Sequence, residues 1–149
     1  MGGGLGYTYQ NAVVLIGSKT GTTRTPATLT NAYASGLSAT VKTGGMSKIN
    51  LDILYTTGTG ETNNSIEIKV ESSPDGTNFY QIPNEAVSGA TSTLTQREFT
   101  FVGASAATAY SISLPIDVQD AYYKFSFKES GVASNAGTLY VEAVLGGAK

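Results

Sequence analysis

The chain contains no histidine, no cysteine and no tryptophan among its 149 residues. The absence of histidine excludes His-based catalytic triads, and the absence of cysteine excludes thiol nucleophiles, disulfides and the usual Cys/His zinc sites. Because tryptophan is the strongest aromatic platform for sugars, its absence also weakens a carbohydrate-binding function. We therefore expect a protein that is not an enzyme and that carries no cofactor.

Charge of either sign is also scarce. Nine basic and eleven acidic residues give a net charge of -2, and the two arginines, Arg24 and Arg97, lie far apart in the sequence. Nucleic-acid binding depends on clustered Lys and Arg side chains that neutralise phosphates. We therefore expect no nucleic-acid partner.

Long apolar runs are missing as well. The longest compact run, 12–16, is far shorter than a membrane-spanning helix or the core of a signal peptide, and residues 1–4 contain no Lys or Arg. We expect no membrane segment and synthesis in a cytoplasm.

Alternation of apolar and polar residues dominates the rest of the chain, and no segment shows a convincing helical period. The length fits one domain. Short strands separated by polar loops are typical of an all-β, antiparallel β-sandwich, with a jelly roll as one topology. Strands are expected near 5–9, 12–16, 49–53, 66–70, 99–101, 110–118, 123–127 and 139–144.

A turn sequence follows the strand at 66–72. Residues 73–78 read Ser-Pro-Asp-Gly-Thr-Asn, which places Pro where φ is fixed and Gly where φ can be positive. We predict a hairpin in which 66–72 turns toward 79–83.

The N-terminal part of the chain differs in composition. Residues 17–36 consist mainly of Gly, Thr, Ser and Ala, with Leu29 and Tyr33 as the only large apolar side chains, so they cannot form a core of their own. We predict an extended arm at 1–35 and a sandwich domain at 36–149. Such an arm gains order by docking on another chain, or else on the sandwich itself.

Carboxylates are the remaining candidates for chemistry. Asp117 and Asp120 have the close spacing that a glycosidase needs, but a polar turn explains them better because nothing nearby would shift their pKa values. Asp75 and Asn78 offer oxygen ligands for calcium without the Asp-x-Asp-x-Asp-Gly pattern, which again favours a turn. We predict no catalytic residue and no metal site.

Tyrosine is the more informative aromatic residue, since the chain has nine Tyr against five Phe. Tyrosines outside the core anchor protein interfaces, and sugar stacking is the alternative. Three candidates lie in the arm, and two more neighbour aromatic core positions but point to the opposite face. With the arm's arginine, the predicted interface residues are Tyr7, Tyr9, Arg24, Tyr33, Tyr80 and Tyr122.

Three stretches carry a family resemblance: 66–82, with its Ser-Pro-Asp-Gly-Thr-Asn-Phe turn, the aromatic strand at 121–131, and Thr-Leu-Tyr-Val-Glu-Ala at 138–143. Together they resemble β-sandwich virion proteins of tailed bacteriophages, head decoration (cement) proteins foremost. Strand-turn-strand patterns with Asp-Gly-Thr also occur in carbohydrate-binding sandwiches.

The resemblance implies a structural virion protein on the capsid surface that binds the major capsid protein and sister subunits as a homo-oligomer, with a trimer around a local threefold as the expected symmetric arrangement. Other virion roles, in the tail, baseplate or head fibre, are the first alternative. A carbohydrate-binding module with a glycan ligand is the second.

Overall fold

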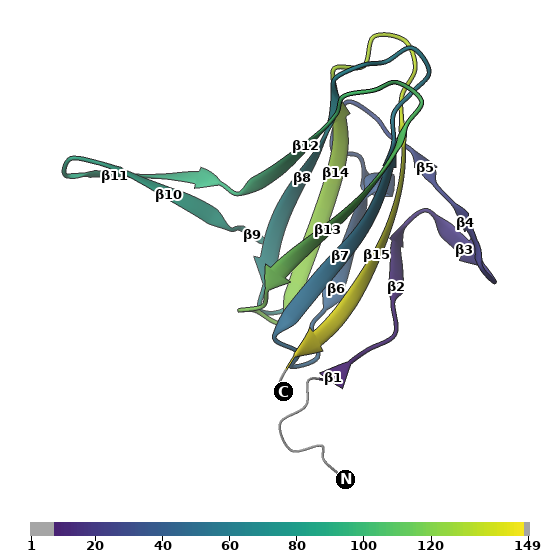
Figure 1. The fold of residues 1–149 in the computed structure, drawn as a ribbon. Coiled ribbons are helices and arrows are strands. Elements are labelled where there is room, and N and C mark those ends of the chain that lie inside the picture. The colour runs from purple at the N-terminus through teal and green to yellow at the C-terminus, as the bar shows by residue number, and fades with distance from the viewer. Residues whose placement is uncertain (1–7, 148–149) are drawn as a thin grey trace.

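The computed structural model describes residues 8–147 (Figure 1). Two antiparallel sheets pack face to face, so the predicted all-β sandwich is confirmed, while the jelly-roll topology stays a prediction. Among these residues no helix is long and apolar enough to cross a bilayer. One short 3-10 helix, η2 (Ser35–Leu37), precedes β6.

The strands fall into four sheets. The six-stranded sheet contains β1 (Thr8–Tyr9), β2 (Val13–Ile16), β5 (Ala27–Thr28), β7 (Lys48–Thr56), β13 (Ala109–Asp117) and β15 (Thr138–Gly147). The five-stranded sheet contains β6 (Ser38–Lys42), β8 (Asn64–Ser73), β9 (Tyr80–Gln81), β12 (Glu98–Gly103) and β14 (Tyr122–Ser130). Two separate hairpins consist of β3 (Ser18–Thr20) with β4 (Thr23–Thr25), and β10 (Pro83–Ser88) with β11 (Thr91–Gln96).

The strand order makes two consecutive strands of the chain the edge strands of the two sheets. In the six-stranded sheet β7 lies between β13 and β15, and β1, β2 and β5 pair with the other edge of β15. In the five-stranded sheet the order is β12, β8, β14, β6, with β9 also pairing with β8. Strands β12 and β13 therefore end their sheets, and they follow each other in sequence.

The core lies between the two sheets and follows the predicted alternation. On β7 the residues Ile49, Leu51 and Ile53 are almost fully buried while Asp52 is exposed. They face the inner residues of the other sheet, among them Phe125 on β14. Burying a large apolar side chain stabilises the fold by about 1.5–3 kcal/mol, so this layer is the main source of stability.

The predicted turn after β8 is confirmed. Asp75 Oδ1 accepts the N–H groups of Thr77 and Asn78, both at 2.8 Å, and Ser73 Oγ accepts that of Gly76 at 2.9 Å. These bonds hold the pKa of the Asp75 carboxyl well below its ordinary value. Strand β9 then pairs with the end of β8, as expected.

The described part of the N-terminal segment finds partners in its own chain. Strands β2 and β5 pair with β15, and Ile16 and Leu29 are buried in the core. The alternative in which this segment docks on the sandwich itself therefore describes residues 8–35 better than docking on another chain. Ile16 and Leu29, the two apolar side chains named above, already pack within the molecule.

Candidate protein-interaction surface

The β10–β11 hairpin projects away from the sandwich in Figure 1. Ser88 pairs with Thr91, so the loop is the dipeptide Gly89-Ala90, and Gly89 has a φ of 61°. A glycine at the first position of a two-residue loop suits a type II′ turn. Sequence analysis missed these strands, although the Gly-Ala pair between Val87 and the β-branched threonines was a usable signal.

One face of this hairpin carries two exposed apolar side chains, Val87 and Leu94, although Glu85 is the register partner of Leu94. The side chains of Val87 and Leu94 are 68% and 66% exposed. Val87 pairs with Ser92, and side chains two residues apart on a strand share a face, so Leu94 lies diagonally opposite Val87. The other face carries small side chains such as Ala86 and Thr93.

Most of the large apolar side chains that are exposed fall in one stretch of the sequence, which includes this hairpin. Five large ones are exposed between residues 8 and 147, and four of them fall within 80–102. These four are Tyr80, Val87, Leu94 and Val102; Val13 on β2 is the fifth. The four do not form one patch, because Tyr80 pairs with Ser72 and Val102 with Ser65 at positions far apart along β8, whereas Val87 and Leu94 share one face of the hairpin.

The side of the sandwich next to the hairpin is open. Here β12 and β13 are edge strands whose inward side chains are only partly buried: Phe99, Phe101, Tyr110, Ile112 and Leu114. Across the gap, the rings of Phe101 and Tyr110 meet with centroids 5.4 Å apart. On the opposite side β2 contacts β6, and Ile16 and Val41 are buried.

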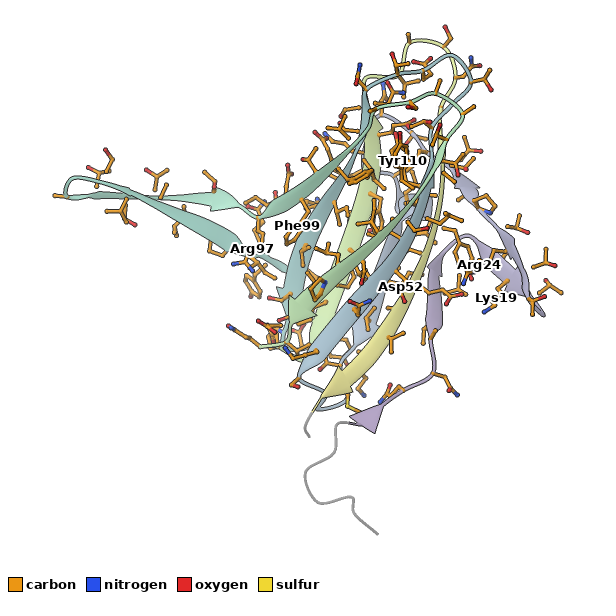
Figure 2. All side chains as sticks on the ribbon, in the orientation of Figure 1. Lys19, Arg24, Asp52, Arg97, Phe99 and Tyr110 are labelled. Carbon is orange, nitrogen blue, oxygen red and sulfur yellow. The ribbon has the colours of Figure 1, made fainter. Side chains whose placement is uncertain are left out.

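A groove of about 570 Å³ opens at the base of the hairpin. Its apolar walls come from both sheets and include Ile82, Phe99 and Ile116. The Arg97 N–H donates to the Ile82 carbonyl at 2.7 Å and closes the hairpin base. Figure 2 shows Arg97 and Phe99 where the hairpin joins the sandwich.

The two aspartates considered for catalysis line this groove but have structural partners. Asp117 forms an ion pair with Lys48 at 3.1 Å, and Asp120 Oδ1 accepts the N–H of Ala121 at 2.9 Å. The Asp120 contact lies in the turn between β13 and β14, whereas Asp117 ends β13 and pairs with Lys48, its cross-strand neighbour on β7. Within the described chain, no group of three His, Cys, Asp or Glu residues could hold a metal ion.

The buried carboxylates lie elsewhere and hold loops. Glu61 accepts the N–H groups of Ala133, Ser134 and Asn135, and these bonds lower the pKa of its carboxyl. Glu129 accepts the Tyr55 hydroxyl and the N–H of Gly137. Each therefore has a structural explanation.

The predicted interface residues of the arm do not form one site. Tyr7 lies outside the described residues, and Tyr9 pairs with Gly146 at the edge of β15. The Arg24 guanidinium lies 5.3 Å above the ring of Tyr140, with its Nε 3.9 Å from Glu142. Arg24 therefore helps to hold the β3–β4 hairpin against β15 in the six-stranded sheet of the same chain.

Tyr33 is also engaged within the molecule. The Nζ atoms of Lys69 and Lys128 lie 4.8 and 4.9 Å from its ring centroid, and its hydroxyl donates to Glu98 at 3.4 Å. Partial burial, followed by the nearby carboxylates, raises the pKa of this hydroxyl. Tyr33 thus fastens the N-terminal segment across the five-stranded sheet.

The two remaining tyrosines differ in exposure. Tyr80 is 63% exposed and lies just before the hairpin in the chain. Tyr122 is half-buried, Lys42 Nζ lies 6.0 Å from its ring, and a Cβ at Gly76 would lie 3.1 Å from the same ring. Of the predicted interface residues, Tyr80 is the one that lies exposed next to the hairpin.

Comparison with protein-family models gives no match for this chain, and a search of curated proteins finds no significant match.

Proposed function

We propose that this protein is a structural component of a tailed-phage particle that decorates the outside of the capsid shell and binds neighbouring subunits through protein contacts. The β10–β11 hairpin is the observation that carries the proposal. An isolated two-stranded hairpin is marginally stable in water. One that leaves Val87 and Leu94 exposed gains most by docking on a protein surface.

The composition of this surface supports protein contact over the other interactions considered. Val87 and Leu94 are apolar, and Tyr80, just before the hairpin in the chain, combines an apolar ring with a polar hydroxyl, which suits protein interfaces. Many modest contacts of this kind on one shell, to the major capsid protein and to sister subunits, would add up by avidity. The resemblance of 66–82, 121–131 and 138–143 together to β-sandwich virion proteins, head decoration proteins foremost, is the sequence support for the virion setting, with synthesis in the host cytoplasm.

A tail, baseplate or head-fibre role would use the same surface and differs in copy number. Quantitative mass spectrometry of density-purified particles separates them. The proposal predicts a fixed number of copies of this chain per copy of the shell protein, on the order of one. The copy number of a Val87→Ser/Leu94→Ser variant should fall well below that of the wild type. A few copies per particle would indicate the tail or a fibre, and absence from particles would contradict a virion role.

Carbohydrate binding is the second candidate, and the exposure of Tyr80 is the observation that favours it. A ring of this kind can stack on a sugar. A glycan array with the wild type and Tyr80→Ala tests this function. Binding that Tyr80→Ala abolishes would replace the proposal, whereas no binding would leave Tyr80 as part of the protein-contact surface.

A further inference from the structure

The geometry points to a binding site for a neutral saccharide in a pocket on the outer face of the six-stranded sheet. The pocket has a volume of about 300 Å³ and lies where the β3–β4 hairpin meets β15, β7 and β13. None of its lining residues belongs to the β10–β11 hairpin, so the inference goes beyond the proposed function. It also differs in place from the sugar candidate at Tyr80, which pairs with β8 in the other sheet.

Two rows of outward side chains form the floor of the pocket, each running from β15 across β7 to β13. The first row is polar and consists of Glu142, Asp52 and Ser113. The second row consists of Tyr140, Leu54 and Ser111. Side chains directly opposite on neighbouring strands have their Cβ atoms about 4.5–5.5 Å apart. The six residues therefore present one compact surface, and all of them line the pocket.

The β3–β4 hairpin covers one side of this floor. Tyr140 and Glu142 are only 2% and 7% exposed although they lie on the outer face of the sheet. The Arg24 guanidinium lies 5.3 Å from the ring centroid of Tyr140, and a Cβ at Gly17 would lie 2.9 Å from the same ring. Figure 2 shows Arg24 on the hairpin and Asp52 on the sheet. The pocket is therefore a hollow between a sheet face and a hairpin that lies close against it.

The two carboxylates of the first row keep hydrogen-bonding capacity for a ligand. The contacts of Glu142 with the Tyr140 hydroxyl and with the two basic side chains of the hairpin all fall on Oε1, so Oε2 is not used in them. Asp52 is exposed and accepts an N–H of Asn50 at 2.9 Å. Like charges directly opposite on neighbouring strands repel each other. Hydrogen-bond donors from a ligand would stabilise this pair.

Stability alone does not account for a buried carboxylate at this position. Apolar side chains in place of a buried ion pair are often equally or more stabilising. The Tyr140 hydroxyl, and then Lys19 and Arg24, lower the pKa of the Glu142 carboxyl. Ionisable groups that are perturbed in this way and border a cavity are candidates for functional sites. The charged network thus supports a binding role in addition to its contacts with the hairpin.

The balance of charge around the pocket favours a neutral ligand. Lys19 and Arg24 carry two positive charges, and Asp52 and Glu142 carry two negative charges. A ligand of either charge would therefore meet like charges. Hydroxyl groups both donate and accept hydrogen bonds, so those of a sugar can donate to the carboxylates and accept from Arg24. The half-buried Leu54 offers an apolar contact to the ring carbons.

The size of the pocket limits the length of the saccharide. Small-molecule sites have volumes of about 300–1,000 Å³, and this pocket lies at the lower end of that range. We therefore expect a short saccharide or the terminal ring of a glycan to fill it.

The first test is a titration of the isotope-labelled full chain with the methyl glycosides of glucose, galactose, mannose and N-acetylglucosamine, followed by amide chemical shifts. We expect at least one of them to shift the amides of 52–54, 111–113 and 140–142. Glucosamine, a cation, and glucuronate, an anion, should bind less tightly than the best neutral glycoside. No shift of these amides with any neutral glycoside, or tighter binding of either charged sugar, overturns the inference.

Substitutions then locate the contact. Asp52→Ala removes an exposed acceptor on the outer face and should weaken binding about tenfold or more. Ser111→Phe places a ring in the pocket and should abolish binding. The matched control is Asp117→Ala, because Asp117 is exposed at the end of β13 and outside this pocket. It should keep the wild-type affinity. An Asp52→Ala variant that binds as tightly as the wild type overturns the inference.

This inference and the proposed function can fail separately. A chain that binds a neutral glycoside but is absent from particles overturns the proposed function alone. A chain that is present on particles but binds no neutral glycoside overturns this inference alone. Shifts around Tyr80 in place of this pocket would contradict the inference and favour the other sugar candidate.

Discussion

The two hairpins that leave the sandwich are held in opposite ways. The β3–β4 hairpin carries no large apolar side chain, and its Lys19 and Arg24 reach Glu142 on β15 at 3.4 and 3.9 Å. The β10–β11 hairpin exposes Val87 and Leu94 and is closed by a backbone bond at its base. The β3–β4 hairpin is therefore held on the sandwich by ion pairs, whereas the exposed apolar side chains of the β10–β11 hairpin are suited to binding another chain.

Glu142 is central to this difference. It is 7% exposed and accepts the Tyr140 hydroxyl in addition to its two basic partners. Burial, followed by this hydrogen bond, raises the pKa of Tyr140 to about 12. A buried carboxylate with such partners ties a hairpin without any apolar contact.

The largest effect on the free energy of unfolding is expected in the core of the sandwich, from which both hairpins project. Phe125→Ala removes a fully buried ring between the sheets and should lower the free energy of unfolding by about 3–5 kcal/mol. Urea denaturation measures this loss. Phe99→Ala, on the half-open side, should cost less, and equal losses would contradict the contrast between the two sides.

The next effect concerns the polar hairpin. Glu142→Ala leaves the buried Tyr140 hydroxyl without its acceptor and should lower the free energy of unfolding by about 1–3 kcal/mol. It should also speed cleavage by trypsin after Lys19 and Arg24. Glu71→Ala, which breaks a half-buried pair with Lys69, is the control and should change stability by about 1 kcal/mol or less.

Acid should loosen the same hairpin to a smaller extent. The Tyr140 hydroxyl, and then Lys19 and Arg24, lower the pKa of Glu142 below its ordinary 4.5. The ionised form is thus favoured in the folded protein, and its stabilisation is present at neutral pH and lost as the pH falls through the lowered pKa. The protection factors of amides 18–25, which correct for the intrinsic pH dependence of hydrogen exchange, should therefore fall below pH 4.5 in the wild type. Glu142→Gln should remove this pH dependence.

The smallest effect on stability is expected in the apolar hairpin. Val87→Ser/Leu94→Ser should change the free energy of unfolding of the isolated chain by no more than about 0.5 kcal/mol, because both side chains are exposed. The measurement requires dilution until the wild type is monomeric. A large loss in that monomer would mean that the hairpin packs on its own body.

The strands with strict alternation could be predicted from the sequence. On β7 and β8 every second residue is apolar, and a period of two fixes which face is buried. The turn at 73–78 was equally clear, since its hydrogen bonds are made by Ser73 and Asp75 with residues a few positions away. Local chemistry was sufficient in both places.

The candidate surface could not be predicted in the same way. Phe99 and Leu114 alternate like core residues, and their partial exposure depends on which strands end each sheet. Tyr33 and Arg24 were assigned to an interface because the arm has few apolar residues. Their partners Lys69, Lys128 and Glu142 lie far away in the sequence.

The fold class, the positions of the regular strands and the turn after β8 could all be inferred from the amino-acid pattern, because each depends on side-chain period or on neighbouring residues. Tertiary structure decided that β2 and β5 join β15, that β12 and β13 form an open side, and that Val87 and Leu94 stay exposed. These features depend on pairing between distant strands, and a single sequence carries no local signal for such pairing.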